Sequence, residues 1–117
     1  MRNFQKLLSD SLQQHHWSLD EIRKPEHWWA ADIWVISSSR QQFGLQLFVT
    51  FIVDPASLRR NDLAAVWEIA VTREMLTDWH ADGALVSLRP HSRSYPEDIE
   101  AAMIRLDEIR TDDTNAG

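Results

Sequence analysis

We expect an α+β fold for this chain: a two-layer sandwich with a four-stranded antiparallel meander flanked by N- and C-terminal helices, in the order α-β-β-β-β-α. Apolar residues recur at helical spacing near both ends of the chain and alternate with polar ones in between. The connections between the alternating stretches are short, which favours antiparallel neighbours. We expect a single α+β domain over residues 1–110 and a disordered, small-residue C-terminal tail over 111–117.

Two long helices are predicted. Residues 2–14 form an amphipathic pattern in which four apolar side chains share one helical face: Phe4, Leu7, Leu8 and Leu12. The second helix begins with a strong local signal, in which Ser94 caps, Pro96 occupies the first turn, and Glu97 completes a capping box. Its apolar stripe continues to about Arg110.

A short helical turn is predicted over residues 18–24. Ser18 and Glu21 have the spacing of a capping box, so Ser18 would be the N-cap. The turn must stop near Lys24, because Pro25 disfavours helical geometry in the residue before it.

Four strands are predicted, over residues 28–38, 43–53, 64–72 and 84–89. Strict alternation makes 43–53 the clearest of them, with one apolar face formed by Phe43, Leu45, Leu47, Val49, Phe51 and Val53. In the first strand one face would carry Trp28, Ala30, Asp32, Trp34 and Ile36. In the third, one face would carry Ala65, Trp67, Ile69 and Val71, although helix is the alternative there. Residues 38–42 would form the first hairpin loop, and 56–63 a polar connection.

Composition excludes several classes of function. The 117 residues include no cysteine, which excludes disulfides, thiolate catalysis and cysteine-based zinc sites. The formal net charge of −6 opposes nucleic-acid binding and favours a basic partner. No apolar stretch is long enough for a membrane span, and the N-terminus does not have the pattern of a secretory signal, so a cytoplasmic protein is expected. We expect no metal and no cofactor, since the histidines lack metal-ligand spacing and no glycine-rich phosphate loop is present.

Tryptophan is unusually abundant, with six residues in a chain this short. Both faces of the first hairpin are too apolar for a sheet with one solvated face. We therefore expect a protein partner or a second copy of the chain to cover the second face. The alternatives are that the strand registers differ from those assumed, or that one helix packs on each face and makes three layers.

The leading functional hypothesis is a non-enzymatic, acidic protein-binding module, comparable to immunity proteins or secretion chaperones in size and charge only. Tryptophan is enriched at binding hot spots, so the expected anchors on the sheet face are Trp28, Trp29, Trp34 and Phe48. The expected acidic contributors are Asp32, Asp54 and Glu68.

Two alternatives belong to other classes. One is a small enzyme or ligand-binding domain that uses Asp32, Glu68 and His80 in a tryptophan-lined pocket, because a carboxyl in apolar surroundings can act as an acid or base. The other is a structural subunit whose exposed apolar face is a homodimer interface.

Overall fold

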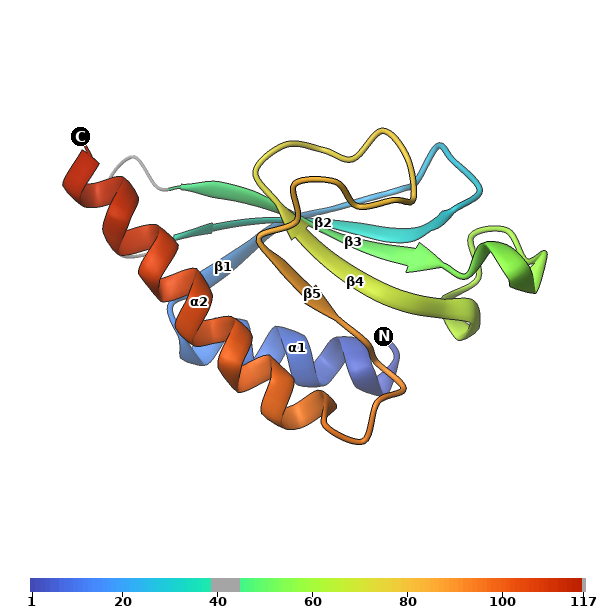
Figure 1. Ribbon diagram of the computed structural model, residues 1–117, viewed down its shortest axis with the longest axis horizontal. Coiled ribbons are helices and arrows are strands. Elements are labelled where there is room, and N and C mark those ends of the chain that lie inside the picture. Colours follow the sequence, from blue (N-terminus) through green and yellow to red (C-terminus); the bar gives the residue numbers. More distant parts are fainter. Residues whose placement is uncertain (39–44, 117) are drawn as a thin grey trace.

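The computed structural model describes residues 1–38 and 45–116, with side chains up to residue 112 in the last helix. It contains five antiparallel strands in the order β1-β2-β3-β4-β5, with both helices on one side of the sheet (Figure 1). The predicted α+β sandwich is therefore confirmed, with one strand more than expected. The elements are α1 (Asn3–Gln14), β1 (Trp17–Arg23), β2 (Ala30–Ser38), β3 (Gln46–Val53), β4 (Val66–Thr72), β5 (Val86–Leu88) and α2 (Tyr95–Ala116), with 3-10 turns at Pro55–Ser57 and Leu63–Ala65.

The additional strand is β1, and the helical turn predicted over residues 18–24 was wrong. Trp17 is buried in the main core and Leu19 packs against it, while Ser18 is exposed. A strand in this position gains backbone hydrogen bonds from β2, whereas a single helical turn would fix several residues for few bonds.

The other strands lie where the alternation predicted them, with shorter bounds. Residues 66–72 form strand rather than helix, as β4, while residues 64 and 65 belong to the 3-10 turn that precedes it. The predicted apolar face of the second strand is confirmed for Leu47, Val49 and Phe51, which are buried in the main core. Residues 39–44, which include most of the predicted hairpin loop and the first residues of that strand, lie outside the described residues.

The main core lies between the sheet and the two helices. Tyr95 of α2 donates a hydrogen bond from its hydroxyl to the carbonyl of Phe4 in α1 at 2.7 Å, which joins the starts of the two helices. At the other end, the buried guanidinium of Arg110 donates to the carbonyls of His15 and His16 and lies over the ring of Trp17. These contacts hold the two helices and the start of β1 together.

The second predicted helix is confirmed, with two differences in detail. The hydroxyl of Ser94 donates to the carboxylate of Asp98 at 2.8 Å, rather than taking part in a box with Glu97. α2 also continues through Ala116, beyond the end expected near Arg110 and into the segment predicted as a tail.

Three β-bulges change which side chains face the core. The extra residues are Asp20 in β1, Ala31 in β2 and Trp67 in β4. A bulge inserts one unpaired residue, so the side chains beyond it change face. The single face expected for the first strand is therefore wrong: Ala30 packs with Trp29 on the opposite side of the sheet from Trp34.

Candidate functional site

The second face of the sheet is covered largely by the chain itself. The loop between β4 and β5, residues 73–85, arches over this face (Figure 1). Its Leu76 and Trp79 pack against two small clusters on the sheet, one around Trp29 and the other around Ile52. Both described helices lie on the other side of the sheet, so the loop does much of the covering that we had assigned to a partner.

The tryptophans differ in exposure, and this decides which can contact a partner. Trp17 and Trp34 lie fully in the main core, and Trp29 is buried under the loop. The structure thus places two of the expected anchors, Trp29 and Trp34, where a partner cannot reach them. Trp28 and Trp79 are half-buried, and their ring centroids lie 5.4 Å apart.

The fourth expected anchor, Phe48, is half-buried on the second face of the sheet. The guanidinium of Arg23 lies over its ring, 5.7 Å from the centroid, and the Nε of Arg23 pairs with Glu21 at 3.2 Å. A cation–π contact with an arginine therefore lies over this ring, where the sequence had suggested an anchor for a partner.

Asp32 interrupts the apolar strand for a structural reason. Its carboxylate accepts hydrogen bonds from the side-chain amide of Gln5 at 2.9 Å and from the indole of Trp34 at 3.2 Å. Asp32 pairs in register with Phe51, a main-core residue, and so lies on the helix side of the sheet. The carboxylate thus serves as the acceptor for donors of two buried residues, Gln5 and Trp34.

The three residues of the expected pocket do not come together. Glu68 is in register with Ile52 on the opposite face from Asp32, and its carboxylate accepts a hydrogen bond from Ser87 at 2.6 Å. His80 lies in the β4–β5 loop and pairs with Asp78 at 3.2 Å. Among residues 1–38 and 45–112, whose side chains the structure describes, no group of three or more His, Asp or Glu is placed to hold a metal ion.

Asp54, the remaining expected acidic residue, organises the turn between β3 and β4. Its side chain accepts a hydrogen bond from the backbone nitrogen of Ala56 at 2.9 Å, and its carbonyl accepts one from the hydroxyl of Ser57 at 2.7 Å. The turn then passes through Leu58, whose φ of 58° is in the left-handed region and whose side chain is 89% exposed. For a leucine this backbone conformation costs about 1–2 kcal/mol.

Asn61 fixes this turn to the start of β2 and the residues just before it. Its side-chain amide donates to the carbonyls of His27 at 2.7 Å and Ala30 at 2.8 Å. Its backbone nitrogen donates to the carbonyl of Trp28 at 2.8 Å. With three hydrogen bonds to one short segment, the turn holds Leu58 in a defined position beside Trp28.

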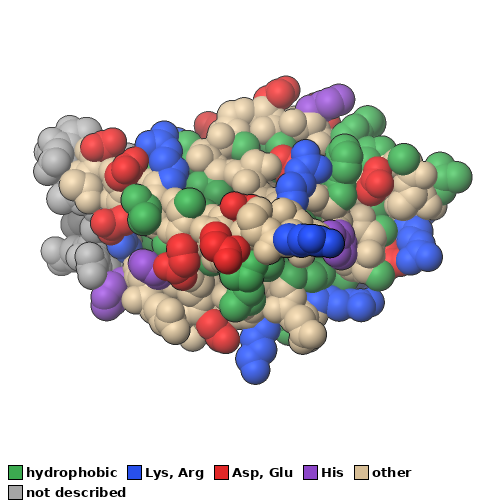
Figure 2. All heavy atoms as spheres, turned by 60° about the horizontal axis from the view of Figure 1, so that its bottom comes forward, with side chains coloured by type: hydrophobic (Ala, Val, Ile, Leu, Met, Phe, Trp, Pro, Cys, Tyr) green, Lys and Arg blue, Asp and Glu red, His purple; other side chains and the backbone are tan. Residues whose placement is uncertain are grey.

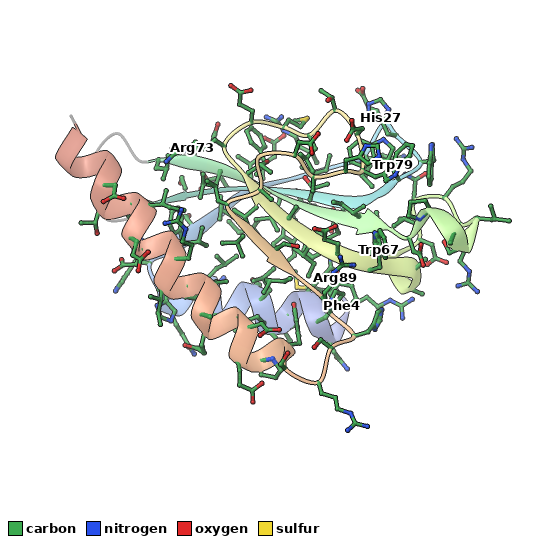
Figure 3. All side chains as sticks on the ribbon, in the orientation of Figure 1. Phe4, His27, Trp67, Arg73, Trp79 and Arg89 are labelled. Atoms are coloured by element: carbon green, nitrogen blue, oxygen red, sulfur yellow. The ribbon has the colours of Figure 1, made fainter. Side chains whose placement is uncertain are left out.

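A hollow of about 360 Å³ lies between the two segments, lined by Trp28, Pro55, Leu58, Arg59 and Arg60. We call these five residues the Trp28–Leu58 surface. Arg59 pairs with Asp62 at 3.2 Å, whereas Arg60 makes no hydrogen bond or ion pair with any described residue. Trp79, which lies above the sheet near His27 in Figure 3, supports Trp28 from the side of the β4–β5 loop.

Two other hollows adjoin the β4–β5 loop. One, of about 410 Å³, is lined by loop residues from 72 to 83 and includes none of the residues predicted from the sequence. The other, of about 200 Å³, has buried Trp29 and Ile33 in its lining, with Lys24 and Glu26 as charged neighbours. Neither brings several predicted site residues to one place.

Sequence reasoning found Trp28 but missed Leu58, Arg59 and Arg60, which it assigned to a polar connection. The sequence did contain a signal for this surface. A leucine followed by two arginines lies in a turn bounded by aspartates, where no strand or helix is expected to bury the leucine side chain. Comparison with known proteins adds no further information: the chain matches no family model, and it resembles no curated protein and no solved structure closely enough to indicate a relative.

No described helix combines the length and the apolar character that crossing a membrane requires.

Proposed function

We propose that this chain is a protein-binding module and that its contact site is the Trp28–Leu58 surface rather than the face of the sheet. The observation that carries the proposal is Leu58, a large apolar side chain that is 89% exposed on a backbone in the left-handed region. Backbone strain of this kind persists where the surrounding structure enforces it, and it is concentrated at functional positions. Here the hydrogen bonds of Asn61 and Asp54 hold the turn in the conformation that keeps Leu58 in the left-handed region.

The energetics favour a contact at this position. Burying a leucine side chain contributes about 1.5–3 kcal/mol, and Leu58 leaves that contribution unused in the isolated chain. Because the turn is already ordered, a partner would meet little entropic cost in fixing it. A half-buried tryptophan and two arginines beside the leucine supply the residue types enriched at binding hot spots.

The charge of the surface indicates the chemistry of the partner. On the face drawn in Figure 2, acidic side chains gather more toward the half of the molecule that holds the end of α2, and Lys and Arg more toward the other half. The lining of the hollow contains two arginines and no acidic residue. We therefore assign to this surface a partner segment that presents an apolar side chain flanked by carboxylates, although the whole-chain charge of −6 had favoured a basic partner. A cytoplasmic location, expected from the sequence, stays part of this proposal.

The test is affinity capture from native cells with matched variants. Leu58→Asp removes the apolar side chain, and aspartate tolerates the left-handed region, so the fold should be retained. Ile104→Asp is the control, since Ile104 is 63% exposed on α2, away from this surface. We expect a protein that is retained by the wild type and by Ile104→Asp and is lost with Leu58→Asp.

Arg60→Glu extends this test to charge, and it should reduce retention because it places an acidic group opposite the partner's carboxylates. Equal retention of the protein by Leu58→Asp and by the wild type would refute the proposal. Circular dichroism must show that Leu58→Asp and Ile104→Asp are folded.

A further inference from the structure

We propose that two copies of the chain associate through the outer edge of β1, in an antiparallel, two-fold pairing centred on Ile22. This inference does not depend on the proposed contact at the Trp28–Leu58 surface. It is based on the exposure of one edge strand and on the order of the charges along it.

β1 is a terminal strand of the sheet, so one row of its backbone groups points away from β2. No described segment forms backbone hydrogen bonds with that row. The opposite edge differs in length, because β5 has three residues and β1 has seven, while each of these strands contacts one helix, β1 with α1 and β5 with α2. On β1 the side chain of Ile22 is 54% exposed, which is unusual for a strand residue in register with the fully buried Trp34. An unpaired edge with an exposed apolar residue is a template for the addition of another strand.

The charges around Ile22 are self-complementary. Along the end of β1 and the residue after it, the order is Asp20, Glu21, Ile22, Arg23 and Lys24, which is two acidic residues, one apolar residue and two basic residues. When a second copy runs antiparallel with Ile22 opposite Ile22, each acidic residue lies opposite a basic one. The best-defined pairs are Glu21 with Arg23 of the second copy, because Glu21–Arg23 pair regularly with β2 beyond the bulge at Asp20.

The same charges discourage other pairings. Charged side chains on an edge strand oppose association with unrelated apolar edges, and a bulge limits the length that can pair. The order found here permits one isologous register, in which both copies use the same surface. Pro25, which lacks a backbone donor, ends the pairing on one side, and the bulge ends it on the other. The paired stretch is short, so we expect a weak dimer, with a dissociation constant in the micromolar range or above.

Glu21 and Arg23 already form an ion pair within one chain, at 3.2 Å. Both side chains are more than a third exposed, so exchanging the one pair within each chain for two equivalent pairs between the chains changes little in electrostatic free energy. Reversing either charge should leave the fold intact, and Arg23→Glu also removes the cation–π contact with the half-buried ring of Phe48.

The test uses sedimentation velocity up to millimolar protein with two charge-reversal variants, Glu21→Lys and Arg23→Glu. In either homodimer, like charges would face each other twice, so association should weaken at least about tenfold. An equimolar mixture restores complementarity, because the two basic residues of one variant face the two acidic residues of the other. We expect a heterodimer of that mixture by native mass spectrometry, with an affinity within a few-fold of the wild type.

Two controls match the charge changes at other exposed positions: Asp10→Lys on α1 and Arg93→Glu in the loop before α2. These should dimerise as the wild type does, and circular dichroism should confirm the fold of all four variants. A wild type that stays monomeric throughout the concentration range would overturn the proposal. So would a dimer that either edge variant forms as readily as the wild type, or a mixture that fails to form the heterodimer.

Discussion

The indole nitrogen of Trp34 donates a hydrogen bond to the carboxylate of Asp32, two residues earlier in β2, at 3.2 Å. The same carboxylate accepts from Gln5 of α1 at 2.9 Å, so one acidic side chain joins a strand to a helix. The pattern that suggested an acid or base among tryptophans is therefore explained by packing, because a buried indole needs an acceptor.

Replacing Asp32 tests that structural role. We expect Asp32→Leu to lower the free energy of unfolding by about 2–3 kcal/mol, since it leaves the indole and the amide without their shared acceptor. Asp32→Asn keeps one acceptor oxygen and should cost less. Urea denaturation measures both, and Glu68→Gln, at a carboxylate that bonds Ser87 on the other face, is the control with a smaller expected loss. An Asp32→Leu protein as stable as the wild type would contradict this role.

Trp34 and Trp28 should respond differently to truncation. Trp34→Ala removes a fully buried ring and should cost about 3–5 kcal/mol, which is enough to unfold a marginal domain. Trp28→Ala removes a half-buried ring, so the fold should persist while partner retention weakens. Thermal unfolding followed by circular dichroism distinguishes the two. Equal destabilisation by both substitutions would show that Trp28 belongs to the core.

Leu58→Gly separates stability from binding. Glycine adopts the left-handed region without strain but gains freedom in the unfolded chain, so the net effect should be a stabilisation of about 0.5–1 kcal/mol. The same substitution removes the exposed side chain and should abolish partner retention. A rise in melting temperature together with loss of retention is the expected result; a fall in melting temperature would show that the side chain stabilises the isolated fold.

The burial of the Tyr95 hydroxyl predicts that the free energy of unfolding depends on pH in the alkaline range. Burial raises the pKa of the Tyr95 hydroxyl above its ordinary value of about 10, so the folded chain keeps this proton while the unfolded chain loses it. The resulting stability is fully present below pH 10 and is lost as pH rises above it, at about 1.4 kcal/mol per pH unit. Tyr95→Phe should cost about 1 kcal/mol at neutral pH through the lost hydrogen bond to Phe4.

The difference in stability between the wild type and Tyr95→Phe should therefore shrink as the pH is raised from 10 to 11. Denaturation at several pH values measures it, and because all other titrating groups are shared, they cancel in the difference. A difference that is constant across this range would contradict the burial of the hydroxyl.

Periodicity predicted most of the fold because a long run of alternating apolar residues, such as the one ending at Val53, is compatible with few structures other than a strand. It failed where bulges interrupt the alternation. In β1 the bulge at Asp20 separates Trp17 and Leu19 from Ile22, so the apolar residues of this stretch no longer alternate with a period of two. The capping-box pattern of Ser18 and Glu21 therefore led to the incorrect prediction of a helical turn. The bulge at Ala31 likewise places neighbouring side chains on the face opposite to the one expected from alternation, and no local sequence pattern indicates such a bulge.

The candidate site was less predictable than the fold. Its position depends on the hydrogen bonds from Asn61 to His27 and Ala30, which join segments about thirty residues apart and have no sequence signature. The cover over the second face likewise depends on Leu76 and Trp79 in a long loop. We had assigned that apolar surface to a partner because short-range patterns cannot show that a loop folds back over a sheet.

Hydrogen exchange of the complex with the retained partner decides between the Trp28–Leu58 surface and the rest of the molecule. We predict slower exchange on binding in residues 27–30 and 54–62, with exchange in α1 and α2 unchanged. Protection confined to the helices, with residues 54–62 exchanging as fast as in the free chain, would contradict the assignment of this surface.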